Sequence, residues 1–75
     1  MQYRFDPEKF SAALARSGKS FELVALRCRV TAGAVRQWRA GDRNPTPDHV
    51  RQMARAIDVP IRDLLRTEID DEVSA

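Results

Sequence analysis

The chain has 75 residues, of which 43% are hydrophobic and 32% charged, and its formal net charge at pH 7 is +2. This length excludes a second domain, and no stretch is long and apolar enough to predict a membrane span. We therefore expect no membrane partner. The single cysteine, Cys28, excludes an internal disulfide and favours a reducing, cytoplasmic setting.

The charge is unevenly distributed along the chain. Residues 1–43 contain nine Lys and Arg against four Asp and Glu, a net +5, whereas residues 44–75 contain four against seven, a net −3. The acidic excess lies at the end, in EIDDEVSA. A basic region beside an acidic end is compatible with a polyanionic partner, although an asymmetry of this size also arises by chance.

The first helix is expected to start at residues 6–7. Asp6 suits the N-cap, and Pro7 suits the first helical position. Phe5 and Phe10 have the spacing of a hydrophobic staple around this cap. Gly18 predicts the end of the helix.

Two helices joined by a tight turn are predicted next. Ser20 caps the segment 20–28, and Thr31 caps a helix that ends before Gly41. The apolar residues of the earlier helix lie at i, i+3, i+4 and i+7, on one face: Phe21, Val24, Ala25 and Cys28. Only Arg29 and Val30 separate the two segments, and so short a connection is typical of a helix-turn-helix.

Two further short helices complete the predicted fold. After the loop GDRNP, Thr46 and Pro47 start a fourth helix, and IRDLLR, residues 61–66, is expected to form a fifth. The apolar stripe of the fourth helix is Val50, Met53, Ala54 and Ile57. No segment alternates like a strand, so the predicted fold class is all-α, a compact bundle of five short helices. The domain would span residues 1–66, with residues 67–75 as an acidic tail or an extension of the fifth helix.

The outer face of the third helix, residues 31–40, is the candidate functional surface. At about 100° per residue, Val35 and Trp38 fall together and should face the core. Gly33, Arg36 and Gln37, with Ala40, then point outward, and Ala32 and Arg39 lie on one flank. A helix that enters the DNA major groove needs little bulk outside, an Arg for guanine and a Gln for adenine.

Other interpretations of this helix remain open. Arg and Gln on an outer face are common on any solvated helix. Trp38, at helical spacing with Val35, is more typical of a core residue than of a base-stacking platform. Gly33 favours the groove hypothesis, because glycine costs a helix about 1 kcal/mol relative to alanine.

From about Phe10 to Leu65 the chain resembles the Cro/C1-type helix-turn-helix domain of the Xre family, the lambda-repressor-like fold of bacterial and phage regulators. The resemblance rests on the order of the helix-turn-helix, a Gly-x-Arg-x-Pro loop, and LARALxV-like and DLL-like pieces. The residues that carry it are Ser20, Ala25, Val30, Thr31, Val35, Trp38, Gly41, Arg43-Asn44-Pro45-Thr46, Met53-Ala54-Arg55-Ala56, Val59 and Asp63-Leu64-Leu65.

The resemblance implies which residues meet DNA. The base-reading positions are Thr31, Ala32, Gly33, Arg36 and Gln37. The phosphate positions are Ser20, Phe21, Arg43 and Asn44, with Arg29 at the turn as a further candidate. Helix N-termini and loop donors suit phosphate oxygens.

The chain departs from the family pattern at three places. Phe21 stands where Gln often contacts DNA, so the phosphate clamp at the second helix would be weaker. Arg29 stands where the turn usually has Gly, and it would adopt a left-handed conformation at some cost. Ala32 and Gly33 replace polar residues that often read bases, which leaves base reading to Arg36 and Gln37.

Two function classes follow. The leading hypothesis is a sequence-specific regulator of transcription that binds double-stranded DNA, such as a small repressor. The alternative is a protein-interaction module or antitoxin-type subunit that keeps the fold with weak or lost base reading, which Phe21, Ala32 and Gly33 favour. An enzyme is not expected: Cys28 and His49 have no third orienting residue, and we predict a buried thiol and an exposed histidine. No cofactor or structural metal site is predicted.

A homodimer is expected through the C-terminal end. Leu65, Ile69 and Val73 lie at i, i+4 and i+8, so an extended fifth helix would present them as one stripe. Two copies would place their recognition helices in successive major grooves, about 34 Å apart. A solvated tail is the other interpretation of the same residues.

Overall fold

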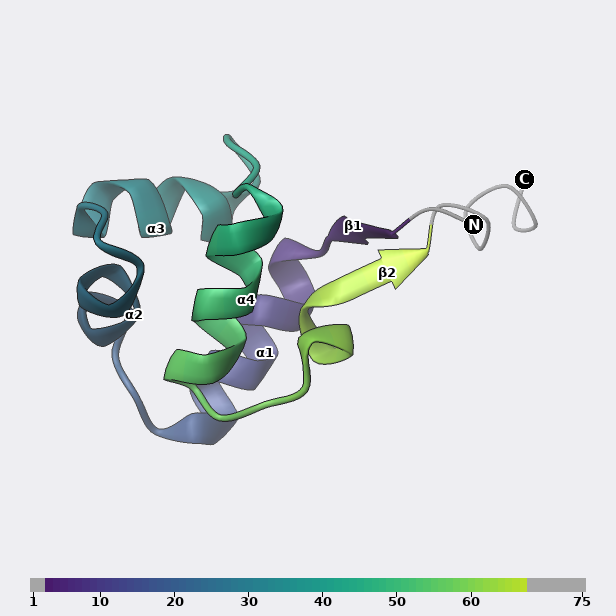
Figure 1. The fold of residues 1–75 in the computed structure, drawn as a ribbon, viewed down its shortest axis with the longest axis horizontal. Coiled ribbons are helices and arrows are strands. Elements are labelled where there is room, and N and C mark those ends of the chain that lie inside the picture. The colour runs from purple at the N-terminus through teal and green to yellow at the C-terminus, as the bar shows by residue number, and fades with distance from the viewer. Residues whose placement is uncertain (1–2, 68–75) are drawn as a thin grey trace.

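The computed structural model describes residues 3–67 as four α-helices with a short two-stranded sheet at one end (Figure 1). In chain order the elements are β1 (Tyr3–Phe5), α1 (Pro7–Ser17), α2 (Phe21–Cys28), α3 (Ala32–Ala40), α4 (Pro47–Ala56), the 3₁₀ helix η1 (Ile61–Leu64) and β2 (Leu65–Thr67). The all-α fold class is confirmed, since the sheet adds only three residues at each end.

The predicted start of α1 is confirmed. Asp6 is the N-cap, and its Oδ1 accepts hydrogen bonds from the backbone N–H groups of Glu8 at 3.0 Å and Lys9 at 3.3 Å. The rings of Phe5 and Phe10 lie with centroids 5.7 Å apart, as expected for a hydrophobic staple. The residues around the cap therefore fix both the start of the helix and the direction of the preceding strand.

The turn between α2 and α3 depends on an arginine in the left-handed conformation. Arg29 has φ 58° and ψ 42°, and its N–H points back to the carbonyl oxygens of Ala25 and Leu26 at the end of α2. Val30 N–H also donates to the Ala25 carbonyl, at 3.0 Å. Thr31 then caps α3. A non-glycine residue in this conformation costs about 1–2 kcal/mol, which the capping bonds offset.

The core lies where the four helices and η1 meet. Its members are buried hydrophobic side chains: Phe5, Phe10, Ala13, Leu14, Val24, Ala25, Cys28, Val35, Trp38, Val50, Met53, Ala54, Ala56, Ile57 and Leu64. Trp38 is 4% exposed, and its ring centroid lies 5.0 Å from that of the His49 ring. The predicted inner faces of α2, α3 and α4 are confirmed, with Phe21 half-buried at the edge of the core.

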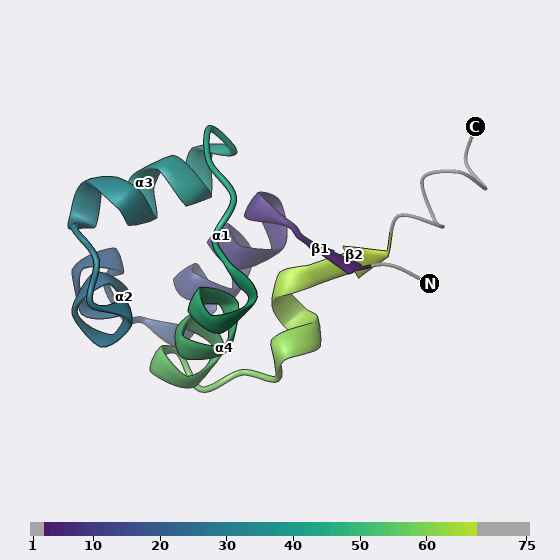
Figure 2. The same ribbon diagram turned by 45° about the horizontal axis from the view of Figure 1, so that its top comes forward.

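The two ends of the described chain form an antiparallel pair, which the sequence did not predict. Tyr3 pairs with Thr67, and Phe5 pairs with Leu65. The expected fifth helix over residues 61–66 is therefore wrong in its second half: η1 ends at Leu64 and the chain continues as a strand. Figures 1 and 2 show this sheet at the opposite end of the molecule from α2.

Backbone and lysine hydrogen bonds hold η1 against α1. Asp6 N–H donates to the Leu64 carbonyl at 2.9 Å. Lys9 Nζ donates to the carbonyl oxygens of Arg62 at 2.9 Å and Leu65 at 2.6 Å. Because these partners lie at the far end of the sequence, the segment that leads into β2 is set by tertiary contacts rather than by local helical spacing.

The expected C-terminal helical stripe is corrected in part. Leu65 belongs to β2, so it does not start an extension of a helix. Ile69 and Val73 lie outside the described residues.

Within residues 3–67, every helix is too short to cross a bilayer. The longest, α1, has 11 residues, whereas a transmembrane helix needs about 20.

Trp38→Ala should destabilise the domain strongly. Removing a large buried aromatic leaves a cavity and typically costs about 3–5 kcal/mol. Urea unfolding followed by circular dichroism measures this loss. Leu26→Ala is the matched control, because the Leu26 side chain is 73% exposed on α2 and its loss should change stability by about 0.5 kcal/mol or less. Equal stability of the two variants would contradict a central role of Trp38 in the core.

Candidate nucleic-acid interface

The outer face of α3 is the predicted functional surface, and its orientation is confirmed. Gly33, Arg36 and Gln37 are exposed, whereas Val35 and Trp38 are buried on the opposite side. Figures 1 and 2 show α3 along one edge of the molecule, with its N-terminus next to the turn from α2. The outer face of α3 is therefore exposed to solvent at one edge of the fold.

The start of α3 presents small side chains. Thr31 is exposed, and its Oγ1 accepts a hydrogen bond from Ala34 N–H at 3.1 Å. Its hydroxyl hydrogen remains available as a donor. Ala32 is half-buried and packs against the core. Ala32 and Gly33 both stand where similar proteins often have polar residues, and of these two only Gly33 is exposed.

Gly33 is not required by the backbone or by packing. A Cβ added there would meet only Thr31 Oγ1, at 3.7 Å, which is an ordinary contact distance. This contrasts with Gly41, whose φ of 84° ends α3 in the left-handed conformation that glycine adopts at least cost. The absence of a side chain at position 33 therefore reduces the bulk of the outer face of α3, and the fold does not require it.

The side chain of Arg36 lies on the ring of Phe21. The Arg36 guanidinium carbon is 4.9 Å from the ring centroid, and that of Arg39 is 5.5 Å from the same ring. The family resemblance placed Phe21 among the phosphate positions. The structure instead brings its side chain together with a candidate base-reading residue, a contact that no local pattern could reveal.

Gln37 is linked to the loop that follows α3. Asp42 N–H donates to the Gln37 carbonyl at 2.9 Å, which folds the loop back against the helix. Arg43 Nη1 then donates to Gln37 Oε1 at 3.3 Å. A predicted base-reading residue and a predicted phosphate residue are therefore neighbours.

Two basic side chains, from Lys19 before the cap of α2 and from Arg39 on α3, lie beside the N-terminus of α2, and sequence reasoning missed this arrangement. The exposed Ser20 caps this helix, and Ser20 and Phe21 border a shallow hollow together with Lys19 and Arg39. Lys19 Nζ donates to the carbonyl oxygen of Ala56, at 3.4 Å. Free N–H groups and two cations make this helix end favourable for an anion. The position of Lys19 directly before the cap was the available signal.

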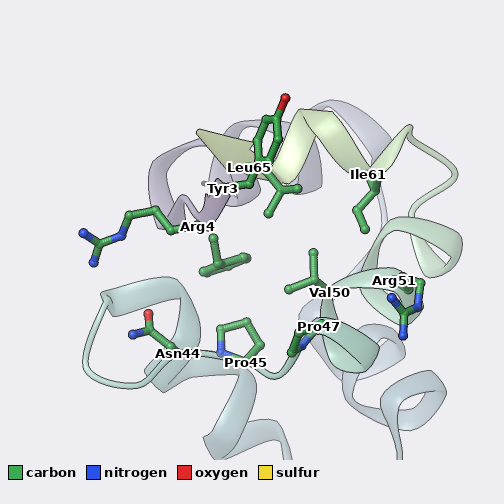
Figure 3. Close-up of a pocket in the computed structure, with 10 residues that line it drawn as sticks. Tyr3, Arg4, Asn44, Pro45, Pro47, Val50, Arg51, Ile61 and Leu65 are labelled. Carbon is green, nitrogen blue, oxygen red and sulfur yellow. The ribbon is translucent and has the colours of Figure 1, made fainter. Parts of the chain in front are cut away.

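Asn44 lies at a second hollow, of about 350 Å³, between the α3–α4 loop and the sheet (Figure 3). Asn44 and Arg4 lie near one end of this hollow, and Ile61 and Arg51 lie near the other. Asn44 and Arg43 are exposed, as a phosphate contact requires. Arg29, the last phosphate candidate, is exposed at the α2–α3 turn.

Cys28 and His49 do not form a catalytic pair. Burial raises the pKa of the Cys28 thiol, which favours the unreactive protonated form. The contact of Cys28 Sγ is with the His49 backbone carbonyl, at 3.8 Å. The expectation that His49 is exposed is wrong: it is half-buried, because its ring packs against Trp38. Between residues 3 and 67, no cluster of His, Cys, Asp and Glu could hold a metal ion.

Two short capped helices joined by a tight turn, in which Arg29 is left-handed, have the geometry of a helix-turn-helix, and the second helix has an exposed polar face. The helix-turn-helix family model matches residues 12–64, and the chain belongs to this family, in its Cro/C1-type form. Its members are DNA-binding regulators and are typically not enzymes. None of the curated proteins compared with the chain matches it.

Gly33→Ala should leave the fold intact and raise its stability by up to about 1 kcal/mol, since alanine is the better helix former and the added Cβ has room. Thermal unfolding followed by circular dichroism measures the shift. Gly41→Ala is the control, and it should destabilise the domain because its φ is positive. A loss of stability in Gly33→Ala would mean that this glycine is needed for packing.

Proposed function

We propose that the protein is a sequence-specific transcriptional regulator of the repressor type, and that it inserts α3 into the major groove of double-stranded DNA. The observation that carries the proposal is the pairing of Arg36 and Gln37 on the exposed face of α3, opposite the buried Val35 and Trp38. Arg suits guanine O6 and N7, and Gln suits adenine N6 and N7, so two adjacent residues can read two kinds of base pair.

The remaining small residues of α3 assist this approach. Thr31 and Gly33 add little bulk to the first turn of α3, so that the helix backbone can come close to base edges. Ala32, half-buried beside them, offers a methyl group to a thymine methyl. Base reading then rests mainly on two side chains.

Phosphate contacts would come from both sides of α3. On one side, the Ser20 cap and the Phe21 amide lie at the positive end of α2. On the other, Arg43 and Asn44 extend from the loop, and Arg29 adds charge at the turn. These groups set the register of the helix on the duplex and carry no base preference.

Two copies bound to one DNA site would together read enough base pairs to distinguish that site within a genome. One short recognition helix reads only a few base pairs, and a two-fold symmetric site doubles that number. We propose this arrangement for the protein, acting on DNA in a bacterial cytoplasm.

A protein-interaction or antitoxin-type role is the second candidate. Leu26, 73% exposed on α2, favours it, because a large exposed apolar side chain is a common contact for another protein. Selection of bound duplexes from a random-sequence library decides between the two. Enrichment of a defined sequence supports the regulator and reports the symmetry of its site, whereas no binding even at low salt supports the interaction module.

Arg36→Ala and Gln37→Ala should each relax sequence preference at one base-pair position. The expected loss is about 1–3 kcal/mol against the enriched duplex, with little change for an unrelated duplex. Fluorescence anisotropy titrations with duplexes substituted at single positions measure it. An equal loss for both duplexes would mean that these side chains contact only phosphate.

Arg43→Ala should weaken binding to every duplex. A protein that makes one phosphate contact fewer releases fewer counterions when it binds. The slope of log affinity against log salt should therefore fall in magnitude by about 1. Arg55→Ala is the matched control: Arg55 is an exposed arginine in the last turn of α4, at the end away from α3 (Figure 1). Equal slopes in the two variants would contradict the assignment of Arg43 to phosphate.

A further inference from the structure

The side chain of Phe21 contacts two arginines of the neighbouring helix. Arg36 and Arg39 are one turn apart on α3, and their guanidinium carbons lie 4.9 and 5.5 Å from the centroid of the Phe21 ring. Both distances are within the range of about 6 Å over which a cation is attracted to the face of an aromatic ring. One ring at the start of α2 therefore contacts two positive charges of the recognition helix.

The ring is a rigid support. Phe21 is half-buried and packs against the hydrophobic core. It is also the first residue of α2, directly after the Ser20 cap, whose hydroxyl accepts a hydrogen bond from Leu23 N–H at 3.2 Å. Its position is thus set by both packing and capping. An arginine, in contrast, has a long side chain with many rotamers, most of which point it away from any one base.

Within residues 3–67, neither Arg36 nor Arg39 forms a salt bridge with an acidic side chain, whereas Arg51 pairs with Asp48 on α4. Two neighbouring arginines repel each other in water. Both guanidinium groups nevertheless lie over the one ring of Phe21, whose negative face attracts cations.

We propose that Phe21 is a positioning residue for base reading, which holds the Arg36 guanidinium ready for a guanine. The inference rests on the proposed function of α3. A guanidinium meets an aromatic ring with its charge and planar face, while its N–H donors lie on the edge and stay free for guanine O6 and N7. Part of the ordering of Arg36 is then complete before DNA arrives, which favours binding.

Phenylalanine at this position, in place of the glutamine common in similar proteins, therefore changes the function of the helix start. The glutamine common here in similar proteins donates to DNA directly. The side chain of Phe21 instead acts through Arg36, so the effect of the ring falls on one base pair, while the backbone amide of Phe21 keeps its phosphate contact.

The test compares Phe21→Leu with Phe21→Tyr in the full chain. Leucine keeps an apolar side chain at the edge of the core but removes the ring, and tyrosine keeps the ring. The probes are a duplex enriched from a random library by the wild type, the same duplex changed at the base pair where Arg36→Ala loses preference, and an unrelated duplex. Anisotropy titrations give the affinities, and thermal unfolding verifies that each variant is folded.

Phe21→Leu should weaken binding to the enriched duplex by about two- to fivefold, the range that corresponds to one exposed cation–π contact. Binding to the changed and unrelated duplexes should stay the same, and Phe21→Tyr should match the wild type. In the Arg36→Ala background, Phe21→Leu should have no further effect. Without DNA, the side-chain protons of Arg36 should show an upfield ring-current shift by NMR in the wild type and in Phe21→Tyr, lost in Phe21→Leu.

Four results would overturn the inference. An equal loss on all duplexes in Phe21→Leu, or no loss on any, would do so while the proposed function stands. If Phe21→Leu does not fold, Phe21→Met is used in its place. The absence of the ring-current shift in the wild type would by itself contradict the contact between Phe21 and Arg36. If the wild type enriches no sequence from the library, both the inference and the proposed function fail.

Discussion

The burial of Val35 and Trp38 is the constraint on which the candidate site depends. The burial of Val35 and Trp38 in the core fixes the rotation of α3 about its own axis. Once they are buried, Arg36 and Gln37 must face outward, and Gly33 lies one turn before them on the same side. The outer face is thus a consequence of core packing. In a domain of this size, packing and presentation of the site depend on the same few side chains.

The turn between α2 and α3 supplies the second requirement. Arg29 in the left-handed conformation ends α2 and redirects the chain within a few residues, so that α3 crosses close to α2. This crossing brings Phe21, at the far end of α2, within reach of Arg36 and Arg39. A turn that usually carries glycine has here a residue with a strain cost. The backbone N–H of Arg29 donates to the Leu26 carbonyl and that of Val30 to the Ala25 carbonyl, which maintains the geometry of the turn.

Sequence reasoning succeeded where the signal is local and failed where it is not. The caps at Asp6, Ser20 and Thr31 and the start of the fourth helix at Thr46 and Pro47 are read from residues within one turn, and all are confirmed. The β1–β2 pair joins opposite ends of the described chain, and three residues per strand are too few for a periodic signal. The ring contact of Arg36 and the Arg43–Gln37 bond also depend on tertiary geometry, so the sequence indicated the residues of the face but not their partners.

These partners bear on how a face with only two proposed reading groups could be selective. Arg36 is supported by α2 and Gln37 by the loop after α3, so neither of these exposed side chains is oriented by α3 alone. Long side chains lose rotamer entropy on binding, and support before binding reduces that loss. If selectivity arises in this way, it depends on residues that never touch a base. Substitution of Phe21 at the start of α2 would then change base preference while the α3 sequence stays the same, and recognition of DNA would be a property of the helix-turn-helix unit rather than of one helix.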